Sequence, residues 1–169
     1  MSSNFRSDTA EIVYDEPSAE DAEAIGALFY EDMLDLGVET TREQMNRLAV
    51  EVIDACKGDH AECVCWVARP GTTGAPCGVV LANFNWSLKF AGRALWIEEL
   101  YVTSAYRRRG IGRSLVEQVL DFAEERGFKG VDLEAYQGNT PASVLYRTMG
   151  FHRLGRERFY YRFGSQEFL

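Results

Sequence analysis

The chain has 169 residues, of which 46% are apolar and 26% are charged, a composition typical of one globular domain with one substantial core. No apolar run approaches the ~20 residues that a membrane-spanning helix needs, and the polar residues 1–11 lack the apolar stretch of a secretory signal. We therefore expect no membrane partner, a flexible arm over residues 1–10, and a single domain over residues 11–169.

The balance of charge is acidic. The chain has 26 Asp and Glu residues against 18 Lys and Arg residues, which gives a formal net charge of −8. A broadly acidic surface repels phosphate backbones and so disfavours nucleic acid as a partner. The same charge would attract a cationic substrate. The plain alternative is that the acidic surface only keeps the protein soluble.

Hydrophobic periodicity predicts a mixed α/β domain with the element order β-α-α-β-β-β-α-β-α-β. Ser18 is expected to open the first helix and Gly37 to end it, and Thr40 or Thr41 is expected to cap the second. Gly127 stands where a glycine commonly follows a helix end. The expected strands cover residues 11–15, 63–69, 77–86, 94–102, 130–136 and 158–163, and the third and fourth helices cover residues 110–127 and 141–149.

The cysteines and histidines do not form a metal-binding pattern. None of the four cysteines belongs to a C-x-x-C pair, and Cys63 and Cys65 are typical small core residues of an apolar strand. His60 could join Cys63 at a metal ion, but the chain has no second ligand cluster, so we expect no metal site. Reduced thiols and the lack of a signal indicate a cytoplasmic protein. The full set of these residues is Cys56, Cys63, Cys65, Cys77, His60 and His152.

The most informative stretch leads from an expected strand into a helix and reads VTSAYRRRGIGRSL at residues 102–115. Gly110 and Gly112 let the backbone approach a ligand closely, and the free N–H groups and positive dipole end of a helix N-terminus favour a phosphate. The neighbouring arginines add charge-assisted donors. The stretch therefore predicts binding of a pyrophosphate-bearing cofactor.

The same turn has three other possible interpretations: a dinucleotide-binding turn, a nucleotide P-loop and a solvated run of charge. A dinucleotide-binding turn needs a small residue where Leu115 stands, and a nucleotide P-loop needs a Gly-Lys-Ser/Thr sequence that does not follow. If the glycine turn stood alone in the sequence, the best interpretation of its arginines would be a solvent-exposed run of charge with no ligand. The features that follow in the same half of the chain argue against it.

Two motifs carry a family resemblance. The pattern R-x-x-G-x-G at residues 107–112, after a strand, resembles the cofactor loop of the GNAT superfamily, the acyl-CoA-dependent N-acetyltransferases. The pattern N-x-x-A-x-x-x-Y at residues 139–146, followed by MGF, resembles the second half of that signature. The resemblance implies a central, mostly antiparallel sheet flanked by helices and splayed between its fourth and fifth strands.

A subfamily resemblance is narrower. Residues 95–102, LWIEELYV, are similar to the corresponding strand of the spermidine/spermine N-acetyltransferases, in which an acidic pair precedes an aromatic-rich strand end. Residues 83–87, NFNWS, are similar to the preceding strand of that group.

The GNAT resemblance implies acetyl-CoA as the donor substrate, without a metal. The pantetheine arm would pair with backbone groups of Leu100, Tyr101 and Val102 in the splayed gap. Asn139 would form a hydrogen bond near the pantetheine, and Tyr146 would lie beside the thioester sulfur. The residues implied to lie around the pyrophosphate are Arg107, Arg108, Arg109, Gly110, Ile111, Gly112, Arg113 and Ser114.

The implied reaction needs a proton acceptor, because an ammonium group has no lone pair and alkyl amines have pKa values near ~10. Glu98 and Glu99 are the candidate bases. Neighbouring strand residues face opposite sides, so only one should reach the acceptor unless a bulge intervenes, and the resemblance favours Glu98. Tyr146 is the candidate acid for the leaving thiolate, and a strand N–H near Tyr101 or Val102 is the candidate oxyanion donor.

Each of these roles has a structural alternative. Either glutamate can be a solvated strand residue or a binder of a cationic substrate, Tyr146 can pack on the sheet, and Asn139 can simply cap the helix that follows it.

The sequence thus predicts an N-acetyltransferase for a primary amine of a small cationic acceptor, with a polyamine favoured by the acidic pair and the net charge. An aminoglycoside, an amino acid or a protein amino group are the alternative acceptors. A non-catalytic acyl-CoA-binding or sensor module of the same fold is the rival class, and a nucleotide-binding oxidoreductase is a distant third. A homodimer is expected because GNAT relatives are commonly dimers.

Overall fold

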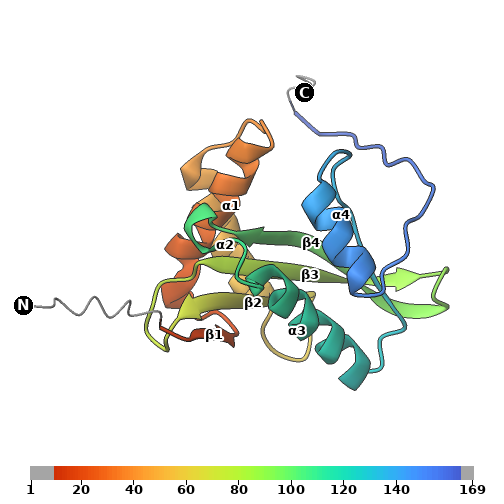
Figure 1. Ribbon diagram of the computed structural model, residues 1–169, viewed down its shortest axis with the longest axis horizontal. Helices are drawn as coiled ribbons and strands as arrows, with labels where there is room; N and C mark the ends of the chain where they lie inside the picture. Colours follow the sequence, from red (N-terminus) through yellow and green to blue (C-terminus); the bar gives the residue numbers. More distant parts are fainter. Residues whose placement is uncertain (1–9, 165–169) are drawn as a thin grey trace, which may run out of the picture. The chain divides into compact units, whose positions relative to one another are not determined.

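The computed structural model describes residues 10–164, and the chain divides into two compact units, one ending at Leu133 and the other beginning at Glu134 (Figure 1). The arm expected over residues 1–10 lies outside the described residues, apart from Ala10. The first unit carries a five-stranded sheet in the order β1-β2-β3-β4-β5. Its strands are antiparallel to their neighbours except for the parallel pair of β4 and β5.

The elements of the first unit follow the expected order, and the mixed α/β fold with a mostly antiparallel sheet is confirmed. Among residues 10–164, no helix combines the length and apolar character that crossing a bilayer requires. The elements are β1 (Ile12–Asp15), a 3-10 turn (Ala19–Asp21), α1 (Ala22–Asp35), α2 (Arg42–Ala55), β2 (Cys63–Pro70), β3 (Gly78–Ser87), β4 (Gly92–Val102), a second 3-10 turn (Ser104–Tyr106), α3 (Ile111–Glu125) and β5 (Val131–Leu133).

Local signals define the ends of the helices. Thr41 Oγ1 accepts a hydrogen bond from the Gln44 N–H at 3.1 Å, and Gln44 Oε1 accepts one from the Thr41 N–H at 2.8 Å. This reciprocal capping box satisfies two donors at the start of α2, and it settles Thr41 rather than Thr40 as the N-cap. Gly127, with φ of 75°, follows the end of α3 in the left-handed conformation that glycine adopts without strain.

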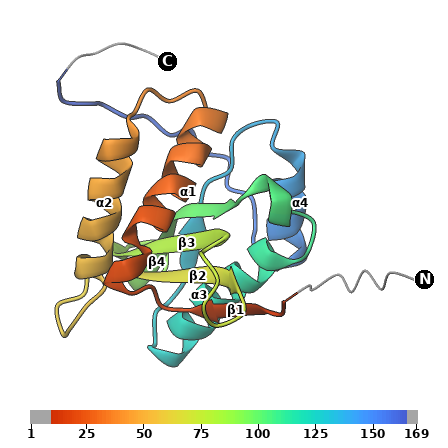
Figure 2. The ribbon, with the colours of Figure 1, turned by 90° about the vertical axis from the view of Figure 1, so that its left-hand side faces the viewer.

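Within the first unit, helices α1 and α2 cover one face of the sheet and α3 covers the other (Figures 1 and 2). Helices α1 and α2 lie side by side, and their buried residues form one cluster with Val67, Val79 and Leu81 of the strands. Strand residues alternate between faces, so Gly78 faces the opposite side, where a Cβ atom would lie 3.3 Å from side chains of both Ile111 and Leu115 of α3. The apolar stripe of α3 is fully buried there, which fixes the helix N-terminus close to the end of β4.

A buried arginine ties the start of the chain to the sheet. Arg69 of β2 is 9% exposed, and its Nη1 and Nη2 atoms each donate to an oxygen of Asp21 at 2.9 Å. Its Nε atom donates to Asp15 Oδ1 at 3.0 Å, and its Nη1 atom also donates to the Gly74 carbonyl at 3.2 Å. Each nitrogen of the guanidinium therefore has a protein partner, and the hydrogen bonds from Arg69 hold the pKa of Asp21 below its usual range despite burial.

Replacing Asp21 with alanine is expected to destabilise the protein by about 3–5 kcal/mol, because the change leaves a buried guanidinium without its main counter-charge. Urea unfolding at pH 7 measures the loss, and the exposed neighbour Glu20→Ala is the matched control, expected to stay within about 0.5 kcal/mol. The pKa of Asp21 is lower in the folded chain, so its contribution is present above about pH 4 and is lost as pH falls through the folded value. A gap between Asp21→Ala and wild type that stays constant down to pH 2 would contradict this account.

The second unit contains helix α4 (Thr140–Thr148) and irregular chain. The strand expected over residues 158–163 is wrong, because no residue between 150 and 164 is in a strand. The side chains there face solvent, with Phe159 85% exposed and Phe163 91% exposed. Three consecutive aromatic residues, 159–161, interrupt the apolar-polar alternation, and without a neighbouring strand the segment has no ladder of hydrogen bonds.

Candidate active site

Strand β4 contains a β-bulge at the acidic pair. Leu81 of β3 pairs with Glu99, and the next residue of β3, Ala82, pairs with Ile97. Glu98 is thus an extra residue with no partner on β3. A bulge of this kind bends the strand and re-aims its side chains.

Because of the bulge, both glutamates lie on the face of the sheet that α1 and α2 cover. Leu81, the partner of Glu99, belongs to the buried cluster beneath these helices, and Glu99 itself contacts Asp32 of α1. The indole Nε1–H of Trp96, which the register places on the same face, donates to Glu98 Oε2 at 2.9 Å. The two carboxyl groups nevertheless differ, since Glu98 is exposed and Glu99 is partly buried.

Glu99 and Asp32 form a carboxyl pair. Their carboxyl groups lie close enough to share a hydrogen bond, which forms when one of them carries a proton. Burial raises the pKa of Glu99, and the negative charge of Asp32 raises it further. Burial also raises the pKa of Asp32, although the hydrogen bond from Glu99 opposes that rise. Near neutral pH the pair therefore holds one proton, mainly on Glu99, and carries one negative charge.

The acidic side of α1 is bonded to the end of β4. Asp35 Oδ2 accepts hydrogen bonds from the Tyr101 hydroxyl and from Arg107 Nη2, each at 3.2 Å. The Thr103 hydroxyl donates to Glu31 Oε2 at 3.0 Å. Burial raises the pKa of Tyr101 to about 12, and the charge of Asp35 adds to the rise, so the phenol stays protonated as a donor. These contacts hold the acidic residues of α1 opposite the bulged part of β4.

Arg107, expected near the cofactor, is anchored within the protein. Its Nε atom donates to the Val102 carbonyl at 2.9 Å, while its Nη2 atom reaches Asp35 and the Tyr101 hydroxyl. The guanidinium therefore joins β4 to α1 and orders the turn that precedes α3.

The edge of β4 that faces β5 is open beyond the bulge. Strand β5 pairs with β4 only at residues 95–97, whereas β4 continues to Val102. No strand among residues 10–164 pairs with residues 98–102 on that side. A free strand edge presents N–H and C=O groups that can bond an extended chain carrying amides. The residues expected to pair with a pantetheine arm, Leu100, Tyr101 and Val102, lie on this stretch, and Arg107 already uses the Val102 carbonyl.

The turn between β4 and α3 leads into the helix N-terminus through two residues in the left-handed conformation, Arg108 and Gly110. Gly110, with φ of 77°, caps α3, and the first helical hydrogen bond runs from the Ser114 N–H to the Gly110 carbonyl at 3.1 Å. Arg108 adopts the left-handed conformation with φ of 63°, which is uncommon for a residue other than glycine. The N–H groups of the first turn point outward, so this end of α3 suits an anionic group. The Ile111 side chain is buried in the core, so it offers only its backbone.

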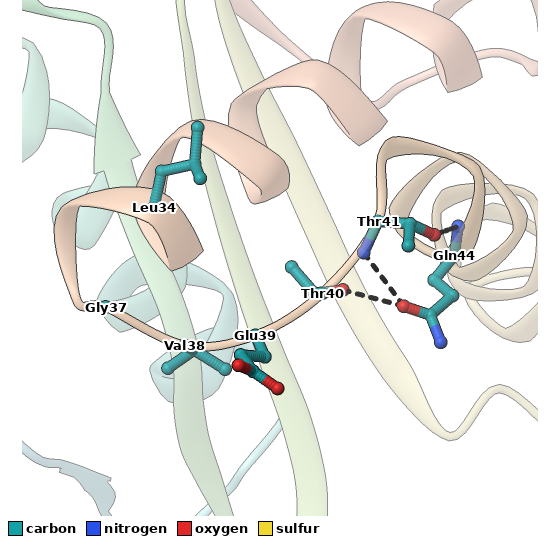
Figure 3. A pocket seen from close by; sticks show the side chains of 7 residues that line it. All are labelled: Leu34, Gly37, Val38, Glu39, Thr40, Thr41 and Gln44. Atoms are coloured by element: carbon teal, nitrogen blue, oxygen red, sulfur yellow. Dashed lines mark hydrogen bonds between the residues drawn. The ribbon is translucent and has the colours of Figure 1, made fainter.

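A hollow of about 650 Å³ lies at the turn between α1 and α2 (Figure 3). Gln44 in its wall is held by hydrogen bonds with Thr40 and Thr41. The hollow begins at Leu34, next to Asp35 of the acidic network. Its lining residues are Leu34, Gly37, Val38, Glu39, Thr40, Thr41 and Gln44.

Two of the expected site residues, Asn139 and Tyr146, belong to the second unit. Asn139 caps α4 by accepting a hydrogen bond from the Ala142 N–H at 3.3 Å. Tyr146 lies on α4 with its ring edge-to-face with Phe151, the centroids 5.9 Å apart. The structure thus brings together the residues on β4, α1 and the turn before α3, and it places Asn139 and Tyr146 on one helix.

The acidic residues of α1 were missed by sequence reasoning. Glu31, Asp32 and Asp35 recur at spacings that put them on one side of a helix, and this was the available signal. They lie opposite Glu99 because α1 packs against β4, and no local sequence pattern specifies that packing. Among the described residues, no group of three or more His, Cys, Asp or Glu side chains is arranged to hold a metal ion.

Comparisons with known proteins place this site in a family. A sequence model of the acetyltransferase (GNAT) family matches residues 28–151. Streptothricin acetyltransferase of Streptomyces lavendulae is 33% identical over 115 residues, which are 68% of this chain and 58% of that protein. Thialysine N-epsilon-acetyltransferase of Bos taurus is 31% identical over 86 residues, which are 50% of each protein.

The fold agrees with these matches. The structure of the aminoglycoside N-acetyltransferase AAC(6')-Iy in complex with CoA superimposes with a TM-score of 0.74 and 14% identity, covering 92% of this chain and 97% of that one. The chain spans about half the length, or somewhat more, of the two curated relatives named above. The family match covers most of the residues that form the site, and the chain therefore belongs to the acetyltransferase (GNAT) family.

Proposed function

We propose that the chain is an acetyl-CoA-dependent N-acetyltransferase that moves the acetyl group directly to an amine of a small, cationic, polyamine-like acceptor. The observation that carries the proposal is the Asp32–Glu99 carboxyl pair, because it offers a proton acceptor on the same strand as a free backbone edge. Membership of the GNAT family supports the reaction class, and the CoA complex of the aminoglycoside acetyltransferase supports the donor.

Two backbone features fit the donor. The open edge of β4 at residues 98–102 would pair with the amide groups of the pantetheine arm. The N–H groups of residues 108–114 would bind the pyrophosphate, helped by the positive end of α3. Acetyl-CoA supplies the activated acyl group. Asn139 would bond near the pantetheine, and Tyr146 would give a proton to the departing thiolate.

The carboxyl pair suits removal of a proton from the acceptor. An alkylammonium group binds a single negative charge favourably, and the pair carries one. Burial raises the pKa of both Glu99 and Asp32, which brings them closer to the pKa of the amine and makes proton transfer less unfavourable. The proton would go to Glu99 once the pair has lost its shared proton, and the neutral amine would then attack the thioester carbonyl.

The surroundings of the pair favour an acceptor with more than one positive charge. Glu31 on α1 and Glu98 on the bulge are the sequence neighbours of Asp32 and Glu99 and add carboxylates, whereas the charge of Asp35 is balanced by Arg107. The net charge of −8 would steer cations toward such a site. The Bos taurus relative is named for the Nε group of thialysine, which accords with a small amine as acceptor.

The test is to incubate the full chain with acetyl-CoA and a panel of polyamines, aminoglycosides, amino acids and peptides, and to follow release of free CoA thiol. Release that depends on a polyamine is expected. Release with another amine would keep the enzyme class and overturn the acceptor. A rise in melting temperature with acetyl-CoA but no release with any amine would favour a binding or sensor module.

Replacing Tyr146 with phenylalanine is expected to lower turnover about 100-fold, because the leaving thiolate loses its proton donor while the ring and its packing on Phe151 remain. The dissociation constant of acetyl-CoA, measured by calorimetry, should stay within about twofold of wild type. Tyr160→Phe is the matched control, since Tyr160 is 70% exposed in the same unit. Unchanged turnover in Tyr146→Phe would remove Tyr146 as the acid.

A further inference from the structure

Two thiol groups meet where α2 ends and β2 begins. Cys56 caps the C-terminus of α2, Cys63 is the first residue of β2, and their Sγ atoms lie 3.4 Å apart. The residues beside them are joined by a hydrogen bond from the Glu62 N–H to the Ala55 carbonyl at 3.0 Å. The backbone therefore keeps the two thiols close to each other. Their approach does not depend on one choice of side-chain rotamer.

The pair differs from the other two cysteines. Cys56 is partly exposed, so a small reagent can reach it, and Cys63 lies directly behind it, 4% exposed. A hydrogen bond from the Cys56 thiol lowers the pKa of Cys63 and raises that of Cys56, whereas burial raises the pKa of Cys65 and of Cys77. Thiolate character is what makes a cysteine reactive, and it is concentrated at this pair.

We propose that Cys56 and Cys63 are a thiol modification site that closes to an intramolecular disulfide on reaction with a low-molecular-weight disulfide. This inference goes beyond the proposed acetyl transfer and does not depend on it. In the first step the Cys63 thiolate accepts the Cys56 proton across the 3.4 Å contact, and the Cys56 sulfur attacks one sulfur of the reagent, which forms a mixed disulfide and releases one thiol. Cys63 then attacks Cys56 Sγ and releases the second thiol. The protein loses two protons and two electrons, and the reagent gains them.

Closure would join the end of α2 covalently to the start of β2. The link constrains the unfolded chain over residues 56–63, so the melting temperature of the oxidised protein should rise by roughly 3–8 °C. The change should reverse with a dithiol reductant.

The test uses the full chain, first reduced and then incubated under native conditions with oxidised glutathione, blocked with an alkylating reagent and digested with trypsin. Cleavage after Arg47, Lys57 and Lys89 places Cys56 in the peptide 48–57 and Cys63, Cys65 and Cys77 in the peptide 58–89, because Pro70 blocks cleavage after Arg69. The expected product is a cross-linked pair of these peptides, lighter by two hydrogens than their sum, and fragmentation should assign the bond to Cys63.

Two variants complete the test. Cys65→Ser should keep the cross-link and the rise in melting temperature. Cys56→Ser, at the more exposed position, should lose the temperature rise and keep its remaining thiols reduced. The proposal is overturned if wild type yields only a glutathione adduct on Cys56, if the bond joins Cys56 to Cys65, or if Cys56→Ser consumes as many thiols as wild type.

Discussion

Replacing Glu99 with glutamine is expected to lower kcat/KM for the amine acceptor about 10²–10⁴-fold at pH 7, the range typical of a lost general base. Glutamine preserves the shape of the side chain and can still donate to Asp32, but it cannot share a proton with it. The basicity of the pair depends on burial and on the mutual repulsion of two carboxyl groups, and the substitution removes the repulsion. The rate of acetyl transfer against pH measures the effect, and the mutant should lose the rise with pH that ionisation of the pair produces.

Glu98→Gln is the matched control for this prediction. Glu98 is adjacent, has the same chemistry and lies on the same face, but it is exposed and bonded to the Trp96 indole. Its substitution should change kcat/KM by no more than about threefold to tenfold, through weaker attraction of a cationic acceptor. A large loss in Glu98→Gln with near-normal rates in Glu99→Gln would make Glu98 the base, as the family resemblance suggested.

The same substitution has a consequence for stability. The pKa of Glu99 is raised in the folded chain, so between about pH 4.3, the ordinary value for Glu, and the folded value the native state keeps a proton that the unfolded chain has lost. Stability must fall as pH rises across that window. Glu99→Gln should therefore raise the melting temperature at pH 8 and give little gain at pH 4. An equal gain at both values would show that the carboxyl is not held protonated.

A feature of the fold or site could be predicted from the sequence when a few neighbouring residues determine it. The cap at Thr41 and the glycine after α3 at Gly127 follow from short-range hydrogen bonds and backbone freedom, and both expectations are confirmed. The glycine turn before α3 was recognised for the same reason, since Gly110 and its neighbours form the turn from their own backbone. These features were identified because a few neighbouring residues determine them.

The remaining features depend on contacts between distant parts of the chain. The Asp32–Glu99 pair joins residues 67 positions apart (99 − 32), and Arg69 meets Asp21 across 48. The bulge at Glu98 was allowed by sequence reasoning but could not be located, because register depends on how β3 and β4 pair along their length. The prediction of a strand over residues 158–163 was wrong for the converse reason. Alternation of side chains is a local pattern, but a strand forms only when a second strand pairs with it.

The second large effect is expected at the N-terminus of α3. Replacing Gly110 with valine should weaken acetyl-CoA binding about 10–100-fold, because a β-branched residue is a poor fit to its φ of 77° and the turn would have to change to relieve the strain. Such a change would move the N–H groups that we propose to bind the pyrophosphate. Loss of one hydrogen bond to a charged group costs about 1.5–3 kcal/mol, which corresponds to the predicted change in affinity. Calorimetric titration with acetyl-CoA measures it.

Gly127→Val provides a control within the same helix. Gly127 has nearly the same conformation, with φ of 75°, and an added Cβ atom at either glycine would meet no atom within 4 Å. Both variants should therefore lose similar stability through backbone strain, while only Gly110→Val loses affinity. Equal losses of affinity would mean that general destabilisation, not the shape of this turn, governs binding. Normal affinity in Gly110→Val, with the expected loss of stability, would move the pyrophosphate site away from the start of α3.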